Sequence, residues 1–223
     1  MMTQFDSPLG GVPSLPEDVQ LVLALGGGEL RQGAWELVAA ALVELALLGR
    51  VGSVPETGFL ARAGVRNLVV LDDRPTGVST LDSVLERFAA RGKPWSAFSC
   101  VKRLCRPVVR ETQDTLIRRG AIRRNGRFGG LKTTLSIVDE SQYRASVYRL
   151  DTAWLNPGAV TDPRSGAFVD LLRNAGRQFS RGAEGEPVIV WEWYPEEVRD
   201  TVAAIFEAER ITTSASSGTG YEG

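Results

Sequence analysis

The chain has 223 residues, of which 43% are hydrophobic and 24% charged, and its formal net charge is −1. This size and composition are typical of one large domain or two small ones with a real core. The sequence contains no histidine, which excludes a Ser-His-Asp triad, a Cys-His dyad and His-ligated zinc. Cys100 and Cys105 are too few for a four-thiolate site, and their spacing is not that of a redox motif, so we interpret both as reduced thiols.

The N-terminal part begins with a segment rich in Pro and Gly at 1–16, which we predict to be flexible. It has neither the basic region nor the apolar region of a signal peptide. An apolar stretch follows at 19–25, and the glycines at 26–28 predict a turn. These glycines do not form a phosphate loop, because no Gly-Lys-Ser/Thr follows them.

The strongest helix signal covers 33–48, where Ala and Leu dominate and Gly49 stands at the C-cap position. This segment is apolar almost all round, so we expect it at the centre of a helical bundle. It is too short, and with Glu36 and Glu44 too charged, to span a bilayer. Trp35 is expected to pack in the core or a groove.

The middle of the chain alternates short elements with Pro and Gly. Residues 51–74 predict short β or irregular structure, and apolar residues at helical spacing predict an amphipathic helix over 78–90, which Gly92 is expected to end. Pro94 is expected to open a helix that ends near Leu104, and Pro107 to open another that ends at Gly120. Paired Asn-Gly and Gly-Gly residues then predict a β-hairpin at 121–138.

The C-terminal part is predicted as a mixed segment at 140–155, a helix at 162–175, a final helix at 195–210 and a disordered tail at 211–223. The aromatic group at 191–194 could stack on a ligand, but packing of the last helix is the favoured interpretation.

Positive charge is concentrated between Lys102 and Lys132, where the net charge is +8 although the whole chain is −1. Such segregation destabilises a chain by self-repulsion, which an anionic partner would offset. The alternative is a solvated helix face balanced by acidic neighbours in the fold. The basic residues are Lys102, Arg103, Arg106, Arg110, Arg118, Arg119, Arg123, Arg124, Arg127 and Lys132.

Two groups within this stretch are candidates for a binding site. Arg103, Arg106 and Arg110 are three and four apart, so on a continuous helix they would share one face and could clamp a phosphorylated head group. A kink at Pro107 would weaken that geometry. At the expected hairpin the candidate membrane-facing residues are Arg123, Arg124, Arg127, Phe128 and Leu131, with the two apolar side chains as an interfacial anchor.

Two other function classes stay open. A helix at 107–119 followed by a hairpin also fits a winged-helix nucleic-acid-binding protein, with the hairpin as the wing. An enzyme with an unfamiliar site is the other possibility. Asp72 and Asp73 could bind a metal, although adjacent acids before a turn are usually turn residues.

Four segments resemble the Golgi phosphoprotein 3 family, which includes a bacterial branch of unknown role. The segment 40–51 is similar to its central-helix signature, 74–88 to its Pro-Thr-Gly turn and helix, 108–122 to its helix before a hairpin, and 162–172 to its Asp-Pro-Arg segment. The likeness covers roughly residues 17–210, with the segments in the family's order. An Arg content of 23 against three Lys is also typical of a GC-rich bacterial genome.

The resemblance implies a mainly α-helical domain: a central helical bundle ringed by amphipathic helices, with one β-hairpin. Eukaryotic members bind phosphatidylinositol 4-phosphate on Golgi membranes and retain glycosyltransferases there. Their head-group pocket uses a Trp and an Arg around the central helix and two arginines before the hairpin. An ungapped match places Glu29, Val38, Arg106 and Val109 at these positions, so Arg106 alone is retained, with Arg110 next to Val109.

We therefore expect a non-catalytic, peripheral membrane adaptor that binds anionic phospholipid head groups and needs no cofactor or metal. Its expected partners are an anionic phospholipid membrane surface and a protein client, with a homo-oligomer as a further possibility and nucleic acid as the alternative. The expected location is the cytoplasm, with peripheral attachment to the inner face of the membrane.

Overall fold

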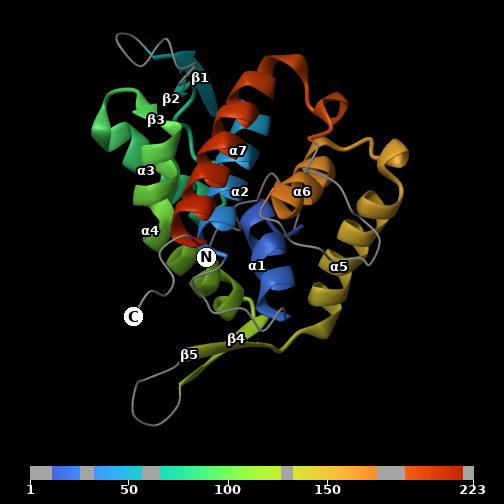
Figure 1. The fold of residues 1–223 in the computed structure, drawn as a ribbon. Helices are drawn as coiled ribbons and strands as arrows, with labels where there is room; N and C mark the ends of the chain where they lie inside the picture. The colour runs from blue at the N-terminus through green and yellow to red at the C-terminus, as the bar shows by residue number, and fades with distance from the viewer. Residues whose placement is uncertain (1–11, 26–32, 57–65, 127–132, 175–188, 218–223) are drawn as a thin grey trace.

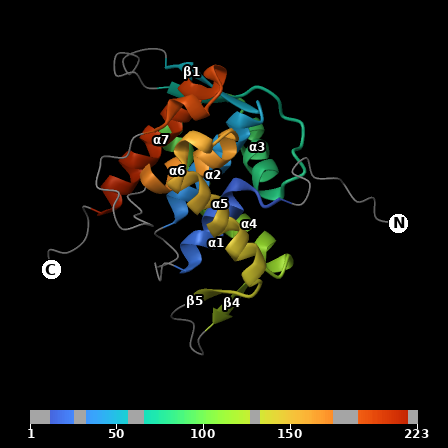
Figure 2. The same ribbon diagram turned by 90° about the vertical axis from the view of Figure 1, so that its right-hand side faces the viewer.

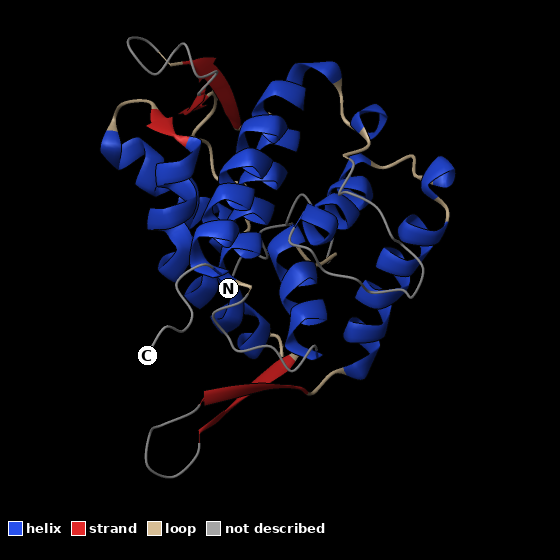
Figure 3. Ribbon diagram, in the orientation of Figure 1, coloured by secondary structure: helices blue, strands red, loops and turns tan. Residues whose placement is uncertain are grey.

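The computed structural model describes residues 12–25, 33–56, 66–126, 133–174 and 189–217. Within these ranges the chain is mainly α-helical, as predicted, with seven α-helices and five short strands (Figure 1, Figure 3). The helices are α1 (Leu15–Leu25), α2 (Ala34–Leu47), α3 (Ser79–Arg91), α4 (Ala97–Arg118), α5 (Glu140–Leu155), α6 (Pro163–Asn174) and α7 (Glu196–Ser217). The strands are β1 (Val51–Pro55), β2 (Arg66–Val70), β3 (Trp95–Ser96), β4 (Ile122–Gly126) and β5 (Thr133–Ile137). Two short 3-10 helices are η2 (Pro157–Ala159) and η3 (Trp191–Trp193).

Helix α2 forms the centre of the fold, which confirms the prediction made from its composition. All but two of its 14 residues are buried, and α1, α4, α6 and α7 pack against it. Gly49 follows the helix with a φ of 67°, a left-handed conformation that glycine adopts without strain, and its N–H donates to the carbonyl of Ala46. None of the described helices is long and apolar enough to cross a membrane.

Helix α4 is a single helix of 22 residues, so the predicted division into a helix ending near Leu104 and another beginning at Pro107 is wrong. An internal proline removes one helical hydrogen bond and costs about 3 kcal/mol. The apolar face of α4 is buried along its whole length against α2, α3 and α7. The favourable free energy of burying that face outweighs the local cost of Pro107. This burial depends on distant parts of the chain and cannot be predicted from the residues around Pro107 alone.

Helices α3 and α4 run antiparallel, joined by a short connection that contains β3. Gly92 ends α3 in the left-handed conformation, as its position predicted. At the other end of the pair the hydroxyl oxygens of Ser79 and Thr115 lie 3.0 Å apart. The connection therefore lies at one end of α4, and the β4–β5 hairpin follows its other end (Figure 1).

The strands form two small antiparallel sheets at opposite ends of the molecule (Figure 1, Figure 2). Strands β1, β2 and β3 form one in that order, with Leu68 opposite Trp95. The β4–β5 pair confirms the predicted hairpin, with Ile122 opposite Ile137 and Gly126 opposite Thr133. The buried side chain of Ile122 packs with Leu116 at the end of α4 and fixes the hairpin to the helix bundle.

Two predictions for the C-terminal part need correction. The segment predicted as mixed is helix α5, whose N-cap residue Asp139 accepts hydrogen bonds from the N–H groups of Ser141 and Gln142. Only three of its side chains are buried, which explains the weak apolar periodicity. The final helix continues to Ser217, beyond the expected start of the tail, and Thr212 is buried in it with its hydroxyl donating to the carbonyl of Ala208.

A buried ionic network connects α1, α2, α5 and α6. The carboxylate of Glu44 accepts a hydrogen bond from the N–H of Leu15 at 2.7 Å and pairs with Arg164 at 2.9 Å. Arg164 also pairs with Asp18 at 3.1 Å, and Asp18 accepts hydrogen bonds from Ser146 and Arg149. The network therefore holds α1 against the central helix α2.

Candidate functional site

Helix α4 carries the predicted head-group residues Arg103, Arg106 and Arg110 on its outer face. The hydroxyl of Ser96 accepts a hydrogen bond from the N–H of Ser99 and begins the helix, and Gly120, with a φ of 73°, follows its end. Because the helix is continuous, the spacing of three and four residues places the three guanidinium groups on one face. All three residues are exposed.

Pro107 does not interrupt helix α4, but it removes one of the helical hydrogen bonds of the backbone. A proline has no N–H, so the carbonyl of Arg103 lacks its usual helical donor four residues on. Pro107 is half-buried, and its neighbour Val108 is buried in the core. The three arginines therefore stand over a rigid, core-packed stretch of helix.

Acidic partners balance the C-terminal half of α4 and the start of the hairpin. Four ion pairs form here between described residues, and in one of them the acid lies far away in the sequence. The contacts are Arg110–Asp114 at 3.6 Å, Arg118–Glu111 at 3.6 Å, Arg119–Glu17 at 3.0 Å and Arg124–Asp114 at 3.2 Å. Four of the ten basic residues of this stretch therefore have an acidic partner. Glu111 and Asp114 are already subtracted in the +8, so only Glu17 adds a further negative charge.

The N-terminal half of α4 differs, because its cations make no ion pair with any described residue. This applies to Lys102, Arg103 and Arg106, all of which are exposed. Arg110 stands between the two halves: its side chain is 84% exposed, and its ion pair with Asp114 is long at 3.6 Å. The uncompensated charge thus lies on the first two turns of α4 and the turn that follows.

Most of the residues that match the head-group pocket by resemblance are not exposed charged groups. Val38 is fully buried in α2 and its side chain belongs to the core, Val109 is half-buried, and Glu29 lies outside the described residues. Arg106 is exposed beside Cys105, where burial raises the pKa of the thiol and the guanidinium opposes that rise. Of the three described positions, Arg106 is the one that presents a charged group to solvent.

The hairpin is a weaker candidate surface in its described part. Arg123 and Arg124 are both exposed, but Arg124 donates to Asp114 and Arg123 donates to the side chain of Asn125 at 3.1 Å. The predicted anchor residues Phe128 and Leu131, together with Arg127, lie outside the described residues.

Asp72, one of the two adjacent acids interpreted as turn residues, has that role. Asp72 accepts hydrogen bonds from the backbone N–H and guanidinium of Arg74 and pairs with Arg50. The hydrogen bond from Arg74 is the main reason that the pKa of Asp72 lies far below its usual range. Across the part of the chain that the structure describes, no group of three or more His, Cys, Asp or Glu could hold a metal ion.

The aromatic group at 191–194 packs the C-terminal helices, as the favoured interpretation held. Tyr194 is buried against Phe206 of α7, with ring centroids 6.4 Å apart. Trp193 covers Gly166 of α6 so closely that an added Cβ would lie 2.7 Å from its ring. These residues hold α6 and α7 together.

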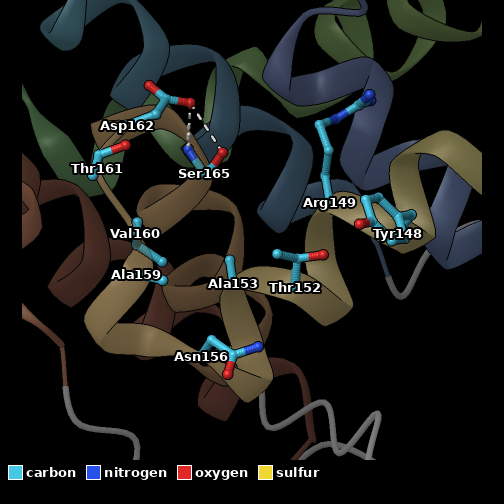
Figure 4. Close-up of a pocket in the computed structure, with 10 residues that line it drawn as sticks. All are labelled: Tyr148, Arg149, Thr152, Ala153, Asn156, Ala159, Val160, Thr161, Asp162 and Ser165. Atoms are coloured by element: carbon cyan, nitrogen blue, oxygen red, sulfur yellow. Dashed lines mark hydrogen bonds between the residues drawn. The ribbon is translucent and has the colours of Figure 1, made fainter.

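An open hollow of about 190 Å³ lies between the C-terminal end of α5 and the start of α6 (Figure 4). Its lining includes Tyr148, Asn156 and Asp162. The carboxylate of Asp162 is engaged at the start of α6, where it accepts hydrogen bonds from Ser165 (Figure 4). The hollow therefore presents no set of converging free charges.

Sequence analysis missed the ionic network of Asp18, Glu44 and Arg164. Its signal was present, because Glu44 interrupts an otherwise apolar helix and a buried carboxylate needs a partner. Glu44 and Arg164 also lie in two of the family-like segments, so these segments carry structural residues.

One comparison with known proteins identifies a family. The model of the family described as Golgi phosphoprotein 3 (GPP34) matches residues 15–205. The match runs from the first residue of α1 into α7. None of the curated proteins compared with the chain matches it.

Proposed function

Because the chain belongs to the Golgi phosphoprotein 3 family, we propose that it is a non-catalytic protein that binds anionic phospholipid head groups and acts as an adaptor at a membrane surface. The binding face is the outer side of α4 around Arg106. The family match is consistent with a lipid-binding or adaptor role, and the head group expected by resemblance is phosphatidylinositol 4-phosphate.

A single observation carries the proposal: Lys102, Arg103 and Arg106 are exposed and have no acidic partner among the described residues. Other basic residues of the same helix form ion pairs with acidic neighbours. The positive charge of this cluster is not neutralised in that way by the described residues. A guanidinium offers a planar pair of donors that fits a phosphate. Arg106 and Arg110, one turn apart, are the pair best placed to hold one phosphate from one helix face.

The test is co-sedimentation with vesicles of neutral phosphatidylcholine, alone or with added anionic phospholipid. We expect binding to the anionic vesicles that weakens steeply with salt, since each basic residue near such a surface contributes about 1 kcal/mol. A salt titration with duplex DNA in parallel tests the nucleic-acid alternative. Equal sedimentation with neutral and anionic vesicles, or binding to DNA alone, would contradict the proposal.

A further inference from the structure

The uncompensated positive charge of α4 continues across the turn into α3. Between Glu86 and Arg110 the sequence holds seven basic residues, and Glu86 is its one acid. Arg87 and Arg91 stand on the last turns of α3, and Lys93 lies in the connection. All three are exposed, and none makes an ion pair with a described residue.

Arg91 is positioned by a cation–π contact. Its guanidinium carbon lies 4.9 Å from the ring centroid of Trp95. This contact uses no carboxylate, so the positive charge of Arg91 remains uncompensated. Trp95 is itself buried and packs edge-on against Phe88, so the platform beneath Arg91 is rigid.

An exposed aromatic side chain lies in the same stretch of sequence. Phe98 lies in the first turn of α4 and is 41% exposed, and Lys102 is the next residue on the same side of the helix. An aromatic ring among basic side chains is the combination that favours the interface of an anionic bilayer. We call Arg87, Arg91, Lys93, Phe98 and Lys102 the α3–α4 corner.

The α3–α4 corner and the β4–β5 hairpin lie at opposite ends of α4 (Figure 1). A helix of this length spans about 33 Å, several times the screening length of about 8 Å in physiological salt. The two ends therefore act on a charged surface almost independently. The hairpin end carries the compensated arginines, with Arg119 on Glu17 and Arg124 on Asp114.

We propose that the α3–α4 corner is a second contact with an anionic bilayer, and that it turns the N-terminal half of α4 toward the lipid. Phe98 enters the interface while Arg87, Arg91, Lys93 and Lys102 contact lipid phosphates around it. This inference rests on the proposed function, and it adds a surface beyond the Arg106 face and sets the orientation of the protein on the membrane.

The experiment measures partitioning of the full chain onto phosphatidylcholine vesicles with added phosphatidylserine. The corner variant is Arg87→Gln with Lys93→Gln, two exposed residues that make no ion pair with any described residue. Its charge-matched comparison, the hairpin variant, is Arg118→Gln with Arg124→Gln, two ion-paired residues at the hairpin end of α4. Thermal unfolding checks that each variant keeps the fold.

We expect the corner variant to lose about 30-fold in partitioning at low salt, which corresponds to about 1 kcal/mol for each basic residue. The hairpin variant should lose far less. Phe98→Ala should weaken binding several-fold at every salt concentration, whereas Leu155→Ala, which removes a side chain 67% exposed on α5, should not.

The possible failures are distinguishable. If the wild-type chain binds no anionic vesicle, the proposed function and this inference both fail. If it binds, but the corner and hairpin variants lose equally, or Phe98→Ala binds as the wild type does, the inference fails and the proposed function stands.

Discussion

Asp170 gives the most quantitative test of the packing of the C-terminal helices. Its carboxylate is 1% exposed and accepts hydrogen bonds from the hydroxyl of Tyr194 at 3.0 Å and the N–H of Val190 at 3.3 Å. Its nearest cation, Arg173, lies 4.0 Å away. Burial outweighs these contacts and raises the pKa of Asp170 from 3.8 to about 7.

The direction of the effect on stability follows from this rise. The folded protein holds the proton of Asp170 more tightly than the unfolded chain, so ionisation destabilises the fold. The contribution of Asp170 to the free energy of unfolding is most favourable below pH 3.8 and falls until about pH 7. At 1.36 kcal/mol for each pKa unit the total change is about 4 kcal/mol.

Asp170→Asn should remove this dependence, because the amide oxygen still accepts a hydrogen bond and no charge forms. We expect the free energy of unfolding of the variant, relative to the wild type, to rise by about 4 kcal/mol between pH 4 and pH 8 in urea titrations. Glu209, whose pKa burial raises to about 8, is present in both proteins, so its effect cancels. Asp73→Asn, at an exposed position, is the control. The same difference at both pH values would refute the reasoning.

Two further substitutions test the packing and the ionic network. Gly166→Ala should destabilise by about 1–3 kcal/mol, because its Cβ would lie 2.7 Å from the ring of Trp193, whereas Gly158→Ala meets no atom within 4 Å and should be near neutral by thermal unfolding. Arg164→Ala should cost about 3–5 kcal/mol in urea unfolding, because it leaves the buried carboxylate of Glu44 without its cation, whereas the exposed Arg144→Ala should cost less than about 1 kcal/mol. Equal losses within either pair of variants would contradict these assignments.

Local sequence patterns were sufficient to predict the elements whose structure depends mainly on their own residues. The apolar composition of α2 predicted both its helix and its central position, and Gly49 and Gly92 marked two helix ends because both adopt positive φ. The paired glycines predicted the β4–β5 hairpin. The family resemblance added the mainly α-helical architecture.

Features that depend on distant parts of the chain could not be predicted. Burial of one face of α4 overrides the local effect of Pro107, and the partner of Arg119 is Glu17, 102 residues away. Charge counted along the sequence therefore placed the basic site between Lys102 and Lys132. Among the described residues, the basic side chains without an acidic partner include Arg106 and extend back to Arg87.

The most direct test of the proposed lipid-binding function replaces the one pocket arginine that the chain retains. Arg106→Lys keeps the charge but loses the two-pronged donor geometry of the guanidinium. The assay compares vesicles that contain phosphatidylinositol 4-phosphate with phosphatidylserine vesicles of equal charge. We expect the variant to lose about 1–2 kcal/mol of binding to the phosphoinositide vesicles, the size of a charge-assisted hydrogen bond, and to bind phosphatidylserine as the wild type does. Identical binding of variant and wild type to both kinds of vesicle would contradict a specific head-group site at Arg106.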